Sequence, residues 1–401
     1  MNRPLRILCL SFWTPPIVRP QAILIGKMIP EWMRQGVQPV IVTYDVCGTW
    51  DIDAPIYPIS QYKPLRFPFS RIPFLNDLRE YFWYKKTSRL VSELVKKHQI
   101  DVLFSFASPQ DSNIVGALVK KQTGVKFISH FSDPWVDSPL KTYRGLSKIR
   151  ATWLENLVVS ASDLVITVNP KLKDLIAKKY PLSVQEKFRV IPHCYSPADY
   201  DTAQNEAPHD KIIISHLGVF YKKRTPESFF KALSALFEEE PALASRVVVK
   251  LVGGSDRYTD FDAASLESLV SAYHLTNVVE ATPAVPYLES LREMRRADFL
   301  LFIDSEYPFF LPSKIVDYAG SGKPIIGITP NGSVSSDLLH GLGYPSFSHT
   351  DTNQLKDLLR SCLKGEKQLE LNTDYLKQYD VASTTKQLLD LCTSIVATNH
   401  V

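Results

Sequence analysis

The stretch Phe309–Gly327, FFLPSKIVDYAGSGKPIIG, indicates how this chain folds. It follows an apolar, strand-like run and reads as a loop, a short helix opened by Pro312-Ser313, a turn at Gly320–Gly322 and a second buried strand. Unpaired amides at the carboxyl end of a parallel strand are suited to phosphorylated ligands. Asp317, about one turn into the helix, is suited to hydroxyl groups instead. The stretch therefore predicts an α/β sheet with a nucleotide-sugar site.

The same alternation of short apolar runs and helix-length segments extends along nearly the whole chain, which is typical of parallel sheets with crossover helices. At 401 residues the chain has room for about two domains. We expect two doubly wound, Rossmann-like domains that face each other across a cleft. The first covers 1–195, a polar hinge covers 196–210, and the second covers 211–375. A closing helix is expected within 376–401, and its packing back onto the first domain is one option.

Composition excludes several classes of protein. The five cysteines lie far apart without CxxC spacing, so neither a disulfide framework nor a metal site is expected, and a reducing, cytoplasmic compartment fits. No apolar run approaches the ~20 residues of a membrane span. The N-terminus superficially resembles a signal peptide, but its apolar run is short and no small-residue cleavage site follows. A first buried strand is the preferred interpretation.

Charge is distributed unevenly along the chain. Residues 1–200 carry 27 Lys and Arg against 16 Asp and Glu, whereas the rest carry 19 against 26. A basic first half suits nucleic acid, anionic lipid or an anionic substrate. Within it, residues 61–97 interleave nine basic residues with eight aromatics but contain no known nucleic-acid motif. We therefore predict contact with the inner face of a membrane, with an ordinary amphipathic helix on the sheet as the alternative.

The second half opens with a strand that ends at Gly218, a basic loop and a helix. Thr225-Pro226 is expected to form the N-cap and first turn of that helix. Gly218 lets the backbone approach a ligand, and the forked guanidinium of Arg224 is suited to gripping a diphosphate. The alternative is a solvated basic loop, which is the expected state of Lys222 and Lys223.

Several spaced elements together resemble the family 4 glycosyltransferases, which are retaining enzymes of the GT-B fold. They are Gly218 with Arg224, then the LVGG stretch 251–254, the RAD stretch 296–298, and the pattern PxKxxDYxxxGKPII over 312–326. The resemblance implies that Arg224 stabilises the leaving diphosphate and that Asp317 holds the ribose hydroxyls. The donor site would include Gly218, Ser313 and Lys314, with backbone near Thr282 and Pro283 meeting the base. No cofactor or metal is implied, and a UDP-sugar is the default donor.

The sequence departs from the family pattern at several positions. Phe309 occupies the place of the first acid of an E-x7-E pattern, which leaves Glu306 and Lys314 as candidates for holding the sugar. Val219 replaces a common second cation after the loop glycine. Lys314 either compensates for that loss or pairs with Asp317 one helical turn on. The first strand is also followed by SFWTPPIVRP rather than by a glycine-rich loop.

In the first half, SHFSDPW over 129–135 resembles the family segment that lies near the reacting carbon of the sugar. His130 and Asp133 are therefore candidates for orienting donor or acceptor hydroxyls. The alternative is that Asp133 begins a capping turn and Trp135 packs in the core. Arg19 is a candidate for binding an anionic acceptor.

We predict a metal-independent, retaining glycosyltransferase that moves a sugar from a nucleotide-diphosphate donor to a saccharide or lipid-linked acceptor during synthesis of bacterial surface polysaccharide. A nicotinamide-dependent dehydrogenase is the first rival, but no GxGxxG follows the first strand. The second rival is a GT-B protein that has lost catalysis and binds nucleotide sugar or saccharide.

Overall fold

The computed structural model describes residues 3–64, 73–201, 210–221, 224–253 and 261–397. The chain divides into two compact units. Unit 1 comprises Met1–His193 and Val381–Val401, and unit 2 comprises Cys194–Asp380. In each unit the described strands form one fully parallel sheet, with seven strands in unit 1 and six in unit 2. The predicted fold class is confirmed.

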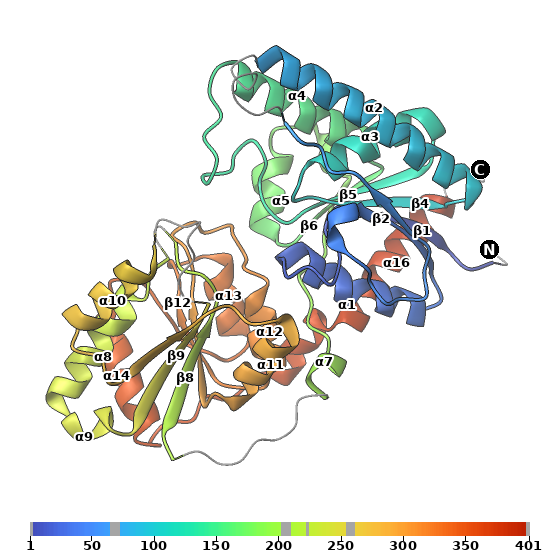
Figure 1. Ribbon diagram of the computed structural model, residues 1–401. Helices are drawn as coiled ribbons and strands as arrows, with labels where there is room; N and C mark the ends of the chain where they lie inside the picture. The colour runs from blue at the N-terminus through green and yellow to red at the C-terminus, as the bar shows by residue number, and fades with distance from the viewer. Residues whose placement is uncertain (1–2, 65–72, 202–209, 222–223, 254–260, 398–401) are drawn as a thin grey trace. The chain divides into compact units, whose positions relative to one another are not determined.

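The sheet of unit 1 has the strand order β3-β2-β1-β4-β5-β6-β7. Helices α2, α3 and α4 cover one face of it, and α1 and the final helix α16 lie on the other (Figure 1). The elements are β1 Arg6–Leu10, α1 Pro20–Arg34, β2 Gln38–Tyr44, β3 Ile56–Ile59, α2 Pro73–Lys97, β4 Val102–Phe106, α3 Asp111–Thr123, β5 Lys126–Phe131, α4 Leu146–Ala161, β6 Leu164–Thr167, α5 Pro170–Ala177, α6 Leu182–Gln185, β7 Phe188–Val190 and α16 Val381–Ala397.

The sheet of unit 2 has the order β10-β9-β8-β11-β12-β13. Helices α8, α10 and α14 lie on one face, and α11, α12 and α13 on the other (Figure 1). The elements are α7 Ala198–Asp201, β8 Ile212–Leu217, α8 Glu227–Glu239, α9 Pro241–Ala244, β9 Val247–Val252, α10 Ala263–Ala272, β10 Val279–Thr282, α11 Tyr287–Arg296, β11 Phe299–Ile303, α12 Lys314–Gly320, β12 Ile325–Ile328, α13 Val334–Gly341, β13 Ser346–Phe347, α14 Thr352–Leu363 and α15 Thr373–Leu376.

Burial explains why the central strands are almost continuously apolar. Strands β8 and β11 are buried along nearly their whole length, because helices cover both faces of the sheet. The two apolar clusters of unit 2 lie on opposite faces of this sheet. The two polar residues of β8, Ser215 and His216, lie near its carboxyl end, and β11 carries none.

Two helix starts differ from the sequence expectation. Helix α8 begins at Glu227, and the carbonyl of Pro226 accepts the first helical bond from Phe230 N at 2.9 Å. Pro226 is therefore the cap, and the expectation that Thr225 is the N-cap was wrong. Helix α12 begins at Lys314, and Ser313 occupies the cap position without a side-chain cap bond. The expected hinge, 196–210, contains the short helix α7, and its residues 202–209 lie outside the described part of the chain.

Helix α3 packs closely against its sheet at Gly116. A Cβ atom on Gly116 would lie 2.5 Å from Cε2 of Phe127, whose side chain is fully buried. We expect Gly116→Ala to lower the free energy of unfolding by about 1 kcal/mol or more, because overpacking outweighs the helix propensity of alanine. Thermal unfolding monitored by circular dichroism measures the effect. Lys121→Ala, on the exposed side of the same helix, is the control, and an equally stable or more stable Gly116→Ala would contradict the packing argument.

Candidate functional site

The carboxyl ends of β8 and β11 form the centre of the candidate site. These strands are neighbours, and the strand order reverses between them because β9 continues on the other side of β8. The carboxyl edge at such a reversal is where open α/β sheets bind their ligands. Gly218 follows β8 and Asp304 follows β11, so the sheet itself brings these two loops together.

Three nitrogen-bearing side chains converge on Gly218. A Cβ atom there would lie 3.0 Å from Lys314 Nζ, 3.4 Å from His216 Nε2 and 3.6 Å from Arg224 Nη2. The backbone φ of Gly218 is +155°, a value that residues with side chains rarely adopt. Glycine at this position therefore leaves open the space in front of two cations.

Lys314 enters this space from the first turn of α12. Its Nζ donates a hydrogen bond of 2.8 Å to the carbonyl oxygen of Leu217, the last residue of β8. Burial lowers the pKa of Lys314 to about 8; the neighbouring Arg224 lowers it too, whereas Asp317 opposes the shift. The charge of Lys314 is therefore sensitive to its surroundings near neutral pH.

Arg224 is held by the turn that follows β8. Backbone hydrogen bonds of 3.2 and 2.8 Å pair Tyr221 with Arg224, and the guanidinium carbon lies 5.7 Å from the centre of the Tyr221 ring. The side chain is 7% exposed, and its Nε has no hydrogen-bond partner among the described residues. A buried donor of this kind indicates a missing acceptor. The adjacent Lys222 and Lys223 lie outside the described residues.

His216 was not identified from the sequence. It points from β8 into the same space, stacks on Phe220 at 4.6 Å, and its Nδ1 lies 2.9 Å from the carbonyl of Leu301. A carbonyl can only accept, so Nδ1 carries the proton and Nε2 is a bare acceptor while the ring is neutral. Burial, followed by the charge of Arg224, holds the pKa well below its usual range. The available signal was a histidine two residues before the glycine, near the end of a mostly apolar strand.

Asp304, which directly follows β11, is a second residue of the site that was not predicted from the sequence. Its carboxylate is fully buried and accepts hydrogen bonds from the amide of Ser305, at 2.6 Å, and from the hydroxyl of Ser335. Burial raises its pKa, while the Ser335 hydroxyl and the charge of Arg224 lower it. Asp304 is thus a hydrogen-bonded carboxyl group whose charge is coupled to that of Arg224.

Asp317 lies on α12, one turn beyond Lys314, and is 4% exposed. Its carbonyl oxygen accepts a 2.6 Å hydrogen bond from the hydroxyl of Tyr200 on α7. Tyr318, the next residue, accepts at its hydroxyl from Leu217 N at 2.7 Å. Helix α12 is thereby fixed against the end of β8. The charge of Asp317 raises the pKa of Lys314, so the carboxylate acts on this cation.

Thr282 and Pro283 lie at the same edge of the sheet but two strands away, at the end of β10. The amide of Gly218 donates to Val252 O at 2.9 Å, and the amide of Gly253 donates to Thr282 O at 2.7 Å. The loops after β8, β9 and β10 therefore lie side by side, in that order, along this edge of the sheet. Thr282 and Pro283 are exposed there.

The structure also describes the residues that were discussed above where this sequence departs from the family pattern. Phe309 packs in an aromatic cluster, with ring centres 6.4 Å from Tyr307 and 5.1 Å from Phe310. Glu306 is exposed, and Val219 is partly buried. Among the residues that the structure describes, no group of three or more His, Cys, Asp and Glu side chains is arranged to hold a metal ion.

The three remaining candidates belong to unit 1. The His130 ring at the end of β5 is 5% exposed, and its Nδ1 has no partner within the described ranges. Burial, with a contribution from His193, lowers its pKa to about 3, so the ring is neutral. Asp133, three residues on, has a pKa raised by burial to about 6. Both residues have the perturbed ionisation that is common at functional sites.

Arg19 lies at the cap position of α1, on the loop that follows β1. It is exposed, and its guanidinium carbon lies 4.1 Å from the centre of the Trp13 ring. The structure thus groups Gly218, Arg224, Lys314 and Asp317 in unit 2. It distributes His130, Asp133 and Arg19 along the carboxyl edge of the sheet of unit 1.

Comparison with known proteins gives matches in sequence and in fold. Residues 22–199 match the sequence model of Glycosyltransferase Family 4. A D-inositol 3-phosphate glycosyltransferase from Streptomyces coelicolor is 24% identical over 197 residues, which are 44% of this chain and 43% of that protein. Its counterpart from Streptomyces scabiei is 24% identical over 185 residues, 44% of this chain and 41% of that protein. The chain therefore aligns with less than half the length of these relatives.

Solved structures match over nearly the full chain. Sucrose-phosphate synthase from Thermosynechococcus elongatus superimposes with a TM-score of 0.71 at 16% identity, covering 99% of this chain and 100% of that one. HepE from Anabaena, in complex with UDP, gives a TM-score of 0.68 at 15% identity, covering 97% and 100%. These likenesses establish the GT-B fold. Together with the match of residues 22–199 to the family model, they show that the chain is similar to family 4 glycosyltransferases.

Proposed function

We propose that the protein is a retaining glycosyltransferase that uses a nucleotide-diphosphate sugar, with a UDP-sugar as the default donor. The observation that carries this proposal is the convergence of Lys314, Arg224 and His216 on Gly218, with Arg224 Nε buried and unpartnered among the described residues. Two cations facing an open space at the carboxyl edge of the sheet suit a diphosphate. The UDP complex of HepE supports UDP as the nucleotide to test first.

The proposed chemistry needs stabilisation of a leaving group. The bond between the anomeric carbon and the diphosphate breaks, and the oxygen of the acceptor hydroxyl bonds to that carbon on the same face while its proton passes to the departing diphosphate. Negative charge grows on the departing diphosphate, and fixed donors aimed at it lower the barrier. Arg224 and Lys314 supply these donors, while Asp317 is assigned to the ribose hydroxyls. His216 Nε2, an acceptor, is suited to a hydroxyl of the ligand.

A specific observation supports the alternative of a binding protein without catalysis. Phe309 and its aromatic neighbours occupy the place where the family often has an acid. A panel of UDP-, GDP- and ADP-sugars distinguishes the two functions. Slow release of nucleotide diphosphate from any donor supports the enzyme, whereas nucleotide binding without release from every donor supports the binding protein.

We further propose that the acceptor is a saccharide linked to a lipid, as in bacterial surface polysaccharide synthesis, and that unit 1 contacts an anionic membrane. Leu78, Tyr81 and Phe82 are exposed on α2, and Leu146, Ile149 and Trp153 are exposed on α4. The two helices are joined by ion pairs of Arg150 with Asp77 and Glu80. Three exposed cations, Lys85, Lys86 and Arg89, follow the exposed apolar residues along α2. No helix within the described ranges is long and apolar enough to span a bilayer.

The first prediction of the proposed function concerns Arg224. We expect Arg224→Ala to lower the rate of nucleotide release from the donor about 10²–10³-fold, the effect of removing one donor from a preorganised anion site. Chromatographic quantification of the released nucleotide measures it, and circular dichroism monitors folding. Arg246→Ala, an exposed arginine of the same unit, is the control. A rate within about threefold of the wild type would remove Arg224 from the mechanism.

The second prediction concerns pH. Because the pKa of Lys314 is lowered to about 8, its charge is present below pH 8 and is lost as the pH rises above it. We expect the affinity for UDP, measured by calorimetry, to fall about tenfold between pH 7 and pH 9.5, since a charged hydrogen bond is lost. Lys314→Arg stays charged over this range and should largely remove this fall. An identical pH profile in the two proteins would argue against the role of Lys314.

The third prediction concerns the membrane surface. We expect the triple variant Tyr81→Ser, Phe82→Ser and Trp153→Ser to bind phosphatidylglycerol vesicles about tenfold or more weakly, because three exposed rings no longer enter the interface. Cosedimentation measures the binding. Leu182→Ser removes an apolar side chain that is 76% exposed on α6 and is the matched control. Equal losses in both proteins, or none in the triple variant, would contradict the assignment of this surface.

A further inference from the structure

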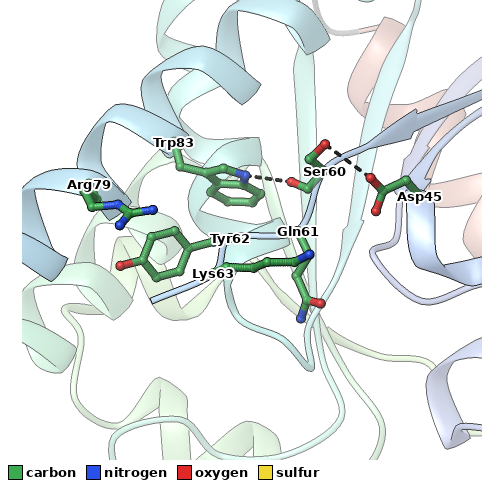
Figure 2. Close-up of a pocket in the computed structure, with 7 residues that line it drawn as sticks. All are labelled: Asp45, Ser60, Gln61, Tyr62, Lys63, Arg79 and Trp83. Carbon is green, nitrogen blue, oxygen red and sulfur yellow. Dashed lines mark hydrogen bonds between the residues drawn. The ribbon is translucent and has the colours of Figure 1, made fainter. Parts of the chain in front are cut away.

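Unit 1 contains a pocket of about 290 Å³ at the carboxyl ends of β2 and β3, beside α2 (Figure 2). Its size is close to the lower end of the ~300–1,000 Å³ typical of small-molecule sites, so it is suited to a ligand of about one sugar ring. The ends of parallel strands are also where such sheets bind ligands. The lining residues are Asp45, Ser60, Gln61, Tyr62, Lys63, Arg79 and Trp83.

The aromatic part of the pocket is held in place before any ligand binds. Trp83 Nε1 donates a 2.8 Å hydrogen bond to the carbonyl of Ser60, and the ring packs edge-on against Phe12 at 5.7 Å. Tyr62 lies 6.4 Å from Trp83, and its hydroxyl donates to the carbonyl of Asn76 at 2.9 Å. Fixed aromatic faces lower the entropic cost of binding. They offer the apolar C–H face of a sugar ring a surface to pack on.

The polar part of the pocket carries both signs of charge. Asp45 Oδ2 accepts a 3.2 Å hydrogen bond from Ser60 Oγ, and this pair presents acceptor and hydroxyl groups at one end (Figure 2). In the same view Arg79 lies beside the Tyr62 ring, and the Lys63 amine lies on the other side of that ring, near Gln61. No ion pair joins Lys63 or Arg79 to another described residue. The cations exceed the carboxylate by one, so the pocket favours a ligand with a negative group.

We propose that this pocket binds a saccharide that carries a phosphate or carboxylate group, with the ring against Trp83 and Tyr62 and the negative group attracted by Lys63 and Arg79, which flank Tyr62. Hydroxyl groups of the sugar would meet Asp45, Ser60 and Gln61. The further assignment of this saccharide as the acceptor rests on the proposed glycosyltransferase function. The binding itself does not depend on that function, so the two can fail separately.

The test is calorimetric titration of the full-length protein with glucose 6-phosphate, glucuronate, glucose and inorganic phosphate. We expect at least one of the two anionic sugars to bind about tenfold more tightly than glucose and inorganic phosphate, because only these ligands combine a ring with a charge. The double variant Lys63→Gln and Arg79→Gln should weaken that binding about tenfold or more. Both side chains are exposed, so the variant is expected to fold.

Three controls make the result specific. Lys121→Gln with Lys178→Gln removes the same charge from exposed positions elsewhere in unit 1 and should leave the affinity unchanged. Arg224→Ala separates this pocket from the site in unit 2, because binding here should not require Arg224. Cosedimentation with phosphatidylglycerol vesicles shows whether the cations serve a lipid headgroup instead.

Each outcome supports or overturns the proposal. Loss of anionic-sugar binding in the Lys63/Arg79 variant alone supports it, whether or not donor hydrolysis is ever observed. Failure of both anionic sugars to bind the wild type overturns it, as does unchanged affinity in the variant or an equal loss in the Lys121/Lys178 control. Loss of vesicle binding without any loss of sugar binding would assign Lys63 and Arg79 to the membrane surface and also overturn it.

Discussion

Two buried cations that face the same glycine are the constraint on which the candidate site depends. Lys314 Nζ and Arg224 Nη2 both approach Gly218, although like charges repel and burial is costly for each. The carbonyl of Leu217 and the nearby carboxylates of Asp304 and Asp317 offset part of that cost. The depressed pKa of Lys314, and the lack of a partner for Arg224 Nε among the residues that the structure describes, indicate that the compensation is incomplete. A ligand with two phosphate groups would supply the missing negative charge and acceptors.

The fold creates this arrangement through the order of its strands. Strand β8 lies between β9 and β11, and all three strands are parallel. The loops that follow these strands therefore lie at the same edge of the sheet. Helix α12 is fixed there by hydrogen bonds between Tyr318, Lys314 and the last residue of β8. A substitution that displaces α12 would therefore move a cation and the Asp317 carboxylate together. This coupling explains how residues 97 positions apart, Leu217 and Lys314, come to share one hydrogen bond.

Much of unit 2 could be predicted because its signals are local. The apolar run before Asp304, the Pro312–Lys323 segment and the Gly218 loop each predict their own element. These elements meet in space because the strands that precede them are parallel, so their carboxyl ends lie at one edge of the sheet. His216 could not be recognised from the sequence, because a polar residue in a buried strand is usually satisfied by its neighbours; only the structure shows that its Nε2 has no hydrogen-bond partner in the described part of the chain. Strand β13 has two residues, which is too short for any periodicity to be visible.

Unit 1 was less predictable, since its pocket depends on side-chain packing rather than on the spacing of residues along the sequence. The segment 61–97 suggested a basic, aromatic surface, but the sequence could not show that Trp83 turns inward while Tyr81 and Phe82 stay exposed. Helical geometry gives the reason. Positions 78, 81, 82, 85 and 89 form one stripe of α2, whereas Arg79 and Trp83 lie on the flank next to β3.

The aromatic residues behind this pocket also connect it to the loop after β1. Trp13 meets Tyr44 at 5.4 Å, Tyr44 stacks on Phe12 at 4.5 Å, and Phe12 meets Trp83 at 5.7 Å. Arg19 rests on Trp13 at one end of this row, and Arg79 lies at the other. Aromatic packing is rigid, so the two guanidinium groups are carried on one framework along the ends of β1, β2 and β3. An extended anionic saccharide could therefore be recognised at two points by side chains that need little reorganisation.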